Sequence, residues 1–510
     1  MSASLRERRG RIWRLGLPPR STKYLIALHA LGVMLTSAVW LETRSGHATL
    51  VFGGGTCIFL FTFLMRSEAR VHPLVITPLS HYFFWQIVYS GISPIVVAMA
   101  NWDNNDIAFG NHATAIDSVG YGYVIYLCGT LFLHLGLQVG RPDERRPRVG
   151  SESASSGWAL AGLWSCGVVA LWGFATLSSA IGSLIGNWGY LALACVCVFA
   201  LNPPRLFRHR AEFWWVLLTT TVLQVLVQAA TGLKGQMMLA FLPLIWLGLF
   251  RRRQRWLLVV APAAVVVVYS AIVNPIVALS RNRGTAGSTN IVRNLYDACQ
   301  QWSGQGGIRG DAVPLGQMLS ESFGRLFDAH PVAIIVQDVQ LSGYLNGESL
   351  GYVGYAFVPR LIWRDKPMVS RGRWMTVRLG WAKDEESATT STGITMAGEL
   401  YWNFGMLGVA AGMFFIGWLD GRLLWCMVGN KPALQPLNMT IYLVAMFTII
   451  GPEAGATIVS IISAFLLFRV TLYVVNRAPR SRRFTGSTDS LYSRGALVRL
   501  SENALTTNRL

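Results

Sequence analysis

Apolar runs of about eighteen or more residues recur along most of this chain, with few charges inside them. A helix rises about 1.5 Å per residue, so each run is long enough to cross a hydrocarbon core about 30 Å thick. Lipid offers no hydrogen-bonding partner to backbone N–H and C=O groups, so a crossing segment must satisfy its own. The sequence therefore predicts an all-α polytopic membrane protein.

The hydropathy pattern predicts twelve spans, one large loop and two basic ends. The spans lie near residues 24–41, 48–65, 74–100, 118–140, 158–178, 184–201, 213–231, 236–250, 256–276, 397–419, 437–451 and 455–475. The chain divides into a basic N-terminal segment (1–23), spans one to nine (24–276), the long loop (277–396), spans ten to twelve (397–475) and a basic tail (476–510). A loop as long as 277–396 is expected to be folded or functional.

The distribution of Lys and Arg predicts the orientation of the spans. Connections on one side include RSEARVH, RPDERRPR and RRRQR, whereas the short connections on the other side hold only Arg44 and Lys234. Because basic residues stay on the cytoplasmic side, both ends are expected to be cytoplasmic and the long loop extracytoplasmic. This signal and attraction to anionic lipid head groups account for the net charge of +19, so nucleic acid is not expected as a partner.

Several segments predict how the loop and the last spans pack. Residues 314–327, PLGQMLSESFGRLF, carry apolar residues at the spacing of an amphipathic helix. Residues 332–341, VAIIVQDVQL, predict a second, more buried segment, and the glycine-rich stretch 343–357 predicts a bent return toward the membrane. Two pairs of glycines, Gly408 with Gly412 and Gly417 with Gly421, have the spacing of small residues at a close helix contact.

The seven cysteines predict neither a disulfide framework nor a zinc site. Most lie in or beside predicted spans, Cys299 is alone in the long loop, and Cys195 and Cys197 are spaced to face different sides of a helix. The chain contains no HExxH, Walker or Ser-His-Asp pattern. No metal ion and no cofactor is therefore expected.

Basic residues are concentrated between residues 359 and 383, which we call the cation-rich segment. It holds seven Lys or Arg residues and a single acid, Asp365. Arginine presents a planar fork of donors that matches phosphate oxygens, and it stays charged at physiological pH. We expect an anion site here, and a solvated, salt-bridged surface is the alternative. The candidate contacts are Arg360, Arg364, Lys366, Arg371 and Arg373, with Arg281 and Arg283 beyond the ninth span as a second pair or an ordinary interfacial anchor.

Four further residues are candidates for the same site. Glu399 falls just inside the tenth span, where an acid is costly, so it is either a base or a group that orients an arginine. His330 is the only histidine of the long loop and is either a base or a helix-ending residue before a proline. Tyr401 is either an interfacial aromatic residue or a platform for a sugar. Asn403 is a candidate substrate contact.

Two motifs of this region resemble a known family. PRLIWRDKP, residues 359–367, followed by GELYWNFGMLG, residues 398–408, is similar to the bacterial Wzy-type O-antigen and exopolysaccharide repeat-unit polymerases. Twelve spans with one large loop late in the chain are similar too. Arg364 stands where the family pattern leads us to expect a proline, which makes the segment more cationic and less stiff.

The resemblance implies a metal-independent glycosyltransferase of the GT-C-like fold class in a bacterial inner membrane. Its substrates would be polyprenyl-pyrophosphate-linked oligosaccharides, with chain-length regulators and flippases as candidate partners beside membrane lipids. It also implies roles in catalysis for Arg360, Glu399 and His330.

Two other functions remain open from the sequence. An O-antigen ligase uses the same donor and a similar bundle. A polysaccharide transporter or lipid flippase would have repeated halves and midplane charges in broken helices, and neither is visible in the sequence.

Overall fold

The computed structural model describes much of the chain between residues 19 and 469. The described stretches are residues 19–71, 77–109, 112–140, 154–176, 189–201, 210–231, 240–250, 291–304, 326–356, 371–384 and 393–428, with isolated residues or pairs at 256–257, 260, 323–324, 358, 363 and between 439 and 469. Within these stretches helices dominate, and one two-stranded sheet is present.

Five helical segments of the described chain are long and apolar enough to cross a membrane. They are residues 24–43, 46–68, 79–100, 116–139 and 396–423. They belong to α2 (Pro19–Thr43), α3 (Gly46–Val71), the continuous run α4 (Pro78–Gln86), η1 (Ile87–Ile92) and α5 (Ser93–Ala100), α6 (Ile116–Val139) and α20 (Met396–Val428). These segments match the predicted first four spans and the tenth, so a mostly helical membrane protein is confirmed.

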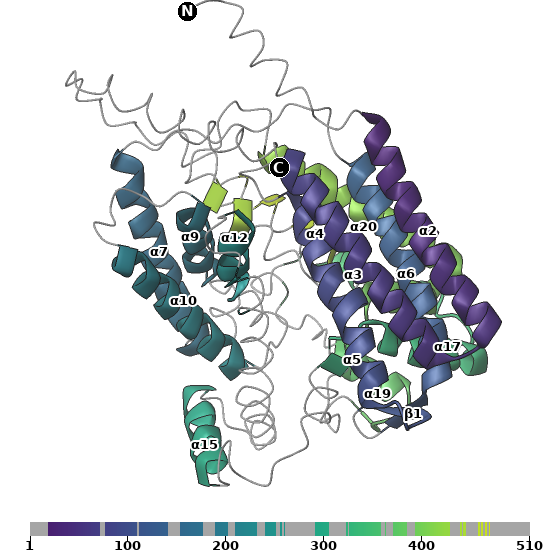
Figure 1. The fold of residues 1–510 in the computed structure, drawn as a ribbon. Coiled ribbons are helices and arrows are strands. Elements are labelled where there is room, and N and C mark those ends of the chain that lie inside the picture. The colour runs from purple at the N-terminus through teal and green to yellow at the C-terminus, as the bar shows by residue number, and fades with distance from the viewer. Residues whose placement is uncertain are drawn as a thin grey trace, which may run out of the picture. The chain divides into compact units, whose positions relative to one another are not determined.

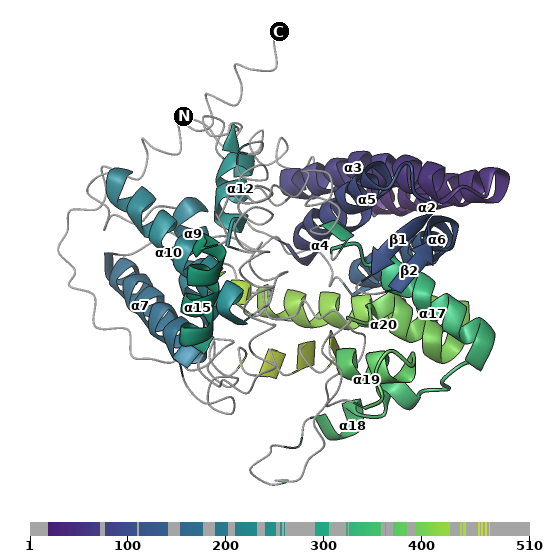
Figure 2. The ribbon, with the colours of Figure 1, turned by 90° about the horizontal axis from the view of Figure 1, so that it is seen from below.

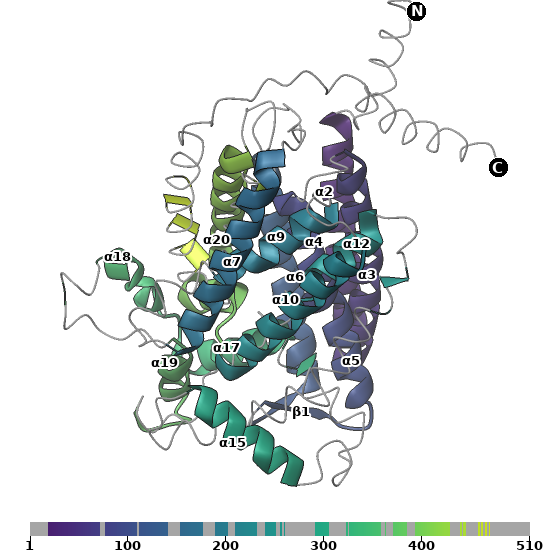
Figure 3. The ribbon, with the colours of Figure 1, turned by 90° about the vertical axis from the view of Figure 1, so that its left-hand side faces the viewer.

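Four other helices coincide with predicted spans five to eight. They are α7 (Ala154–Thr176), α9 (Tyr190–Leu201), α10 (Arg210–Thr231) and α12 (Leu242–Phe250). The helix α9 contacts the other three (Figure 3) and is buried over residues 190–199, as suits a helix that is apolar all round. Predicted spans at 256–276, 437–451 and 455–475 lie largely outside the described residues, so the number twelve stays a prediction.

The helices α6 and α20 lie against each other over much of their length (Figure 1). A Cβ atom on Gly417 would collide with the Leu133 carbonyl, and one on Gly421 would lie 2.8 Å from the Leu137 carbonyl oxygen. Gly136 of α6 is pressed in the same way against the backbone of α20. The predicted close packing is therefore confirmed at Gly417 and Gly421, where only glycine permits it. A Cβ atom on Gly408 or Gly412 would instead meet Leu400, which belongs to α20 itself.

The helix α17 (Ala329–Ser342) corresponds to the buried segment predicted at 332–341. It contacts α6 and α20 (Figure 2), and its first eight residues are buried. Gly122 allows the approach, because a Cβ atom there would lie 2.7 Å from the Ala333 nitrogen. Part of the long loop thus packs directly against membrane-crossing helices. The helix predicted at 314–327 lies mostly outside the described residues.

The remaining described elements are short. The helices are α15 (Ile291–Gly304), η6 (Glu348–Leu350), α18 (Val353–Ala356) and α19 (Arg371–Arg378). The strands β1 (Asp106–Phe109) and β2 (His112–Ala115) pair antiparallel, with Asp106 opposite Ala115 and Phe109 opposite His112. Figure 3 shows this hairpin at the end of α5. The hydropathy pattern predicts only a short connection at residues 101–117, although Gly-Asn between two short strands is a hairpin signal.

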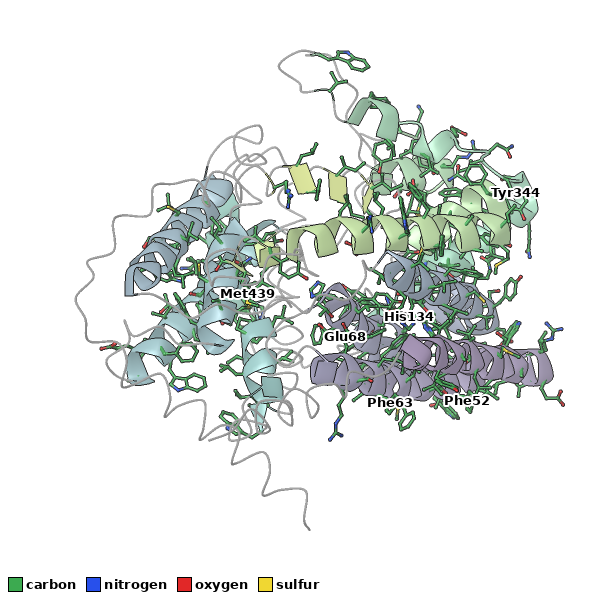
Figure 4. All side chains as sticks on the ribbon, turned by 90° about the horizontal axis from the view of Figure 1, so that it is seen from above. Phe52, Phe63, Glu68, His134, Tyr344 and Met439 are labelled. Atoms are coloured by element: carbon green, nitrogen blue, oxygen red, sulfur yellow. The ribbon has the colours of Figure 1, made fainter. Side chains whose placement is uncertain are left out.

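The bundle formed by α2, α3, α4 and α6 has an aromatic core and an apolar exterior. The ring of Phe61 lies 6.0 Å from that of Phe83 and 6.2 Å from that of Tyr82. On the outward side of α3, Phe52 and Phe63 are exposed (Figure 4). Apolar side chains on both faces are what a helix needs when one face packs in protein and the other meets lipid.

Candidate functional site

The candidate site forms where the beginning of α20 meets the loop 343–351. Glu399 is fully buried and accepts a hydrogen bond from the Ser349 hydroxyl, 3.0 Å from its Oε1. The Asn403 amide donates to the Ser349 hydroxyl at 2.6 Å and to the Glu399 carbonyl oxygen at 2.7 Å. Because Glu399 and Asn403 are four residues apart, they share one face of the helix. We call Ser349, Glu399 and Asn403 the Glu399 cluster.

The loop is hydrogen-bonded into a break in α20. Gly405 has a φ of 62° and a ψ of −153°, which interrupts the helical ladder. The carbonyls of Trp402 and Asn403, which an unbroken helix would bond internally, accept instead from the N–H groups of Leu345 at 2.9 Å and Asn346 at 3.2 Å. Loop and helix are therefore joined by backbone bonds as well as by the cluster.

The two glycines at this junction have distinct roles. Gly347 has a φ of 95° and donates its N–H to the Asn403 Oδ1 at 2.8 Å. Gly405 also adopts a left-handed φ, and a Cβ atom there would lie 2.9 Å from the Tyr344 hydroxyl. Both positions favour glycine because residues with a Cβ rarely adopt such backbone angles.

Trp402 connects the cluster to two elements of the long loop. Its indole N–H donates to the Asp338 carboxylate of α17 at 2.8 Å. The ring of Trp374 in α19 lies 5.5 Å from the Trp402 ring. Nearby, the ring of Tyr401 lies 6.3 Å from that of Tyr344, and Figure 4 labels Tyr344. Residues 371–378 of the cation-rich segment therefore form a helix that contacts the motif GELYWNFG through Trp374.

The structure brings together some of the residues predicted for the site. Glu399, Tyr401 and Asn403 belong to this junction. Arg371 and Arg373 belong to α19, on either side of Gly372 and next to Trp374, and only their backbone is described. The remaining predicted contacts, Arg281, Arg283, Arg360, Arg364 and Lys366, lie outside the described residues.

His330 lies at the other end of α17 from Asp338. It belongs to the first turn of the helix, so the helix begins here and does not end before Pro331. Its side chain is buried, and burial lowers its pKa to about 3 because the charged imidazolium is disfavoured away from water. His330 is therefore neutral at physiological pH. Whether it takes part in catalysis stays a prediction.

Sequence reasoning missed the partners of the predicted residues. Ser349 lies 50 positions before its partner Glu399 in the sequence. Trp402 contacts Asp338 and Trp374, which lie 64 and 28 positions before it. No spacing rule connects residues so far apart. The only local signal was the glycine-rich stretch 343–357, which predicted a tight return without its bonding partners.

The cluster suits the positioning of a loop. Hydrogen bonds are stronger in the protein interior, because the dielectric constant there is lower than in water. The bond from Ser349 to Glu399 is of this kind, and the Asn403 amide connects the Ser349 hydroxyl to the Glu399 carbonyl. Among the described residues, no group of three or more His, Cys, Asp or Glu side chains could hold a metal ion. Comparisons of the chain with protein-family models, with curated proteins and with solved structures give no match.

Proposed function

We propose that this chain is a membrane glycosyltransferase that polymerises polyprenyl-pyrophosphate-linked oligosaccharide repeat units at the outer face of a bacterial inner membrane. In this reaction a hydroxyl of the acceptor sugar attacks the anomeric carbon of the growing donor chain. The bond to the lipid pyrophosphate breaks, and the pyrophosphate leaves with its electron pair. The acceptor hydroxyl loses its proton as the new glycosidic bond forms, and an oxygen of the leaving pyrophosphate can accept that proton.

One contact supports the proposal most directly, the 5.5 Å approach of the Trp374 and Trp402 rings. It fixes α19, which is part of the cation-rich segment, against the beginning of α20. Arg373 precedes Trp374 directly. Cations held beside a leaving pyrophosphate stabilise the charge that builds up on it, and this stabilisation is larger in the transition state than in the ground state.

Within this proposal Glu399 is a positioning residue. Its carboxylate is fully buried and bonded to Ser349, so it secures the loop 343–351 to α20. Arg360, Arg364 and Lys366 would bind one pyrophosphate with Arg371 and Arg373, and Arg281 with Arg283 would reach the pyrophosphate of the second lipid. Tyr401 would lie beside the sugar.

The proposal is tested by the length of lipid-linked glycans in a bacterial strain that lacks this chain. We expect single lipid-linked repeats to accumulate, and the unaltered chain to restore polymer. Arg360→Ala, produced at the same level, should fail to restore it. Arg44→Ala is the matched control, because Arg44 is a cation of a short connection on the same predicted side and should not affect polymer length.

Two other results would contradict the proposal. Full-length lipid-linked chains that accumulate without transfer would identify a ligase. Polymer that is unchanged in the strain lacking the chain would exclude a role in glycan assembly and favour a transporter.

A further inference from the structure

A column of polar side chains runs through the bundle formed by α2, α3, α4 and α6. On α6 its members recur at every fourth residue and therefore share one face of the helix. The column consists of Tyr126, Thr130, His134 and Gln138 from α6, Tyr82 from α4, Gln86 at the end of α4, Ser90 from η1 and His29 from α2. We call these residues the polar column. It is separate from the Glu399 cluster.

The column is unusual because it lies inside segments that are apolar enough to cross a membrane. His29 and His134 are 1% and 0% exposed. The rings of Phe61 and Phe83 lie 5.0 Å from His29 and His134, respectively, and Figure 4 shows His134 within the bundle. Ionisable residues at such positions are costly and usually have a function, since apolar side chains would fill the space without that cost.

The hydrogen bonds determine which ring nitrogens carry protons. The Thr130 hydroxyl donates to the Leu127 carbonyl at 2.8 Å, so its oxygen accepts from His29 Nε2 at 3.4 Å. A neutral His29 then has no proton on Nδ1, and it accepts from His134 Nδ1 at 3.1 Å. His134 Nε2 is consequently free of a proton and accepts from the Gln138 amide at 3.3 Å.

The three links between Gln138 and Thr130 all point the same way, from Gln138 toward Thr130. A proton that arrives at His134 Nε2 can therefore displace a proton from His134 Nδ1 to His29 Nδ1. The His29 ring then releases its Nε2 proton toward Thr130. One proton enters and one leaves, and both rings end neutral with their protons on the other nitrogen. Rotation or exchange of the rings restores the first state.

The column continues to a carboxyl group at its other end. The Tyr82 hydroxyl donates to the Thr130 carbonyl at 2.7 Å, and it is close enough to Tyr126 for the two hydroxyls to interact electrostatically. Tyr126 lies 3.4 Å from Gln86 Oε1 and 3.4 Å from the carboxylate of Asp328, next to the first turn of α17. Tyr82 is bonded to the Thr130 carbonyl and not to the Thr130 hydroxyl, so passage of a proton from Thr130 to Tyr82 and from Tyr82 to Tyr126 requires rotation of the hydroxyl groups. The last step, from Tyr126 to Asp328, is hydrogen-bonded.

A local departure from α-helical geometry accompanies the column. The segment η1 is a π-helix, a form that is frequent at functional sites. Pro94 has no N–H to donate to the Ser90 carbonyl, which accepts from the Tyr123 hydroxyl instead. The Ser90 hydroxyl donates to Gln86, so the π-helix turns a polar side chain toward the column.

We propose that His29 and His134 form a membrane-embedded proton-binding site, and that the polar column carries protons between the Gln138 end of the bundle and Asp328. The titratable groups that face the column from the packed helices, among the described residues, are Cys57 of α3, Tyr89 of η1 and Tyr123 of α6. None of them belongs to the hydrogen-bonded relay around the two histidines. This activity does not depend on the glycan reaction proposed above.

The test is proton flux into liposomes that contain the full chain. The liposomes enclose a pH-sensitive dye, and a potassium gradient with valinomycin sets the membrane potential. We expect the unaltered chain to raise the initial rate of internal pH change above that of protein-free liposomes at the same potential. His134→Gln should return the rate to the protein-free value, because a glutamine amide cannot pass a proton from one atom to another.

Two additional variants and a spectroscopic measurement keep the test decisive. Tyr126→Phe removes one hydroxyl and keeps the ring, so it should abolish the flux even if His134→Gln fails to fold. Thr220→Val is the matched control, because it removes a buried hydroxyl from α10, outside the column, and should leave the flux unchanged. Nitrogen-15 NMR of labelled histidine should find His134 protonated at Nδ1 and His29 at Nε2. Flux equal to that of protein-free liposomes, or unchanged flux in both folded variants, would overturn the proposal.

Discussion

The amide of Asn403 lies 2.6 Å from the hydroxyl of Ser349, although 54 positions separate the two residues. This bond, and the bond from Ser349 to Glu399, connect a loop to a membrane-crossing helix through polar atoms that are shielded from water. Removal of one partner takes a hydrogen bond away from a buried polar group. The free-energy cost of burying a polar group without its partner is larger than the net contribution of the bond to stability.

Asn403→Ala should lower the stability of the folded protein. The substitution removes the amide that donates to the Ser349 hydroxyl, which keeps its bond to Glu399, and it removes the acceptor of the half-buried Gly347 N–H. We expect a loss of about 1–3 kcal/mol in the free energy of unfolding. The measurement is the thermal midpoint of the protein in lipid nanodiscs. Asn104→Ala is the control, because the Asn104 side chain is exposed, and an equal loss in both variants would contradict the role assigned to Asn403.

Gly405→Ala should disturb the junction through the backbone. The backbone angles of Gly405, φ 62° and ψ −153°, lie in a region that is essentially restricted to glycine and cost another residue about 1–3 kcal/mol, and the added Cβ atom would also press on the Tyr344 hydroxyl. We expect a lower thermal midpoint and shorter glycan chains in the complemented strain. Gly354→Ala serves as the control, because nothing lies within 4 Å of a Cβ atom there. A variant at Gly405 that behaves like this control would show that the break in α20 is not required.

Trp374→Ala should shorten the glycan without unfolding the bundle. It removes the ring that holds α19 against Trp402, so the cations of that helix lose their fixed position. Trp374→Phe keeps a ring at the contact and should restore most of the polymer. The measurement is again the length of lipid-linked glycans, with protein levels matched between strains. Full polymer with Trp374→Ala would argue against α19 as part of the site.

Asp328 should make the stability depend on pH. Burial raises its pKa to about 7, whereas the pKa of the same carboxyl group in the unfolded chain is about 3.9. Between these values the folded protein holds a proton that the unfolded protein lacks, so the contribution of Asp328 to stability falls as the pH rises toward 7. Above pH 7 the full penalty of a buried charge is present.

Asp328→Asn removes this titration. The variant should be more stable than the unaltered protein above pH 7, and its advantage should shrink as the pH falls toward 4. His330 works in the opposite sense, because its lowered pKa costs stability as the pH falls below 6.5. That contribution is common to both proteins and cancels in the difference. A difference in thermal midpoint that does not vary with pH would contradict the assignment.

The membrane-crossing helices could be predicted from the sequence because a segment that crosses lipid needs about 20 consecutive, mostly apolar residues. It also pointed to Glu399, since an acid inside an apolar segment is costly and needs a reason. The hydrogen-bonding partners of Glu399 could not be predicted, because Ser349 reaches it only after the loop has folded back. The helix at 371–378 was not predicted, because only the charges of this segment, and not its periodicity, were considered.

The polar column was not found from the sequence either. Four of its members share one face of the span at 118–140, but His29 and His134 belong to spans that are far apart in the chain. Only the packing of α2 against α6 brings the two rings together. Periodicity predicts which residues share one helix face, but it does not predict which helix lies opposite.

The loop bonded into the break of α20 has a consequence for biosynthesis. Leu345 and Asn346 emerge from the ribosome before Trp402 and Asn403, so the donors are made before the carbonyls that they satisfy. Until the two segments meet, those carbonyls have no partner in lipid. In the predicted orientation the loop has crossed the membrane before α20 inserts, so its N–H groups are in place to meet these carbonyls when α20 packs against it.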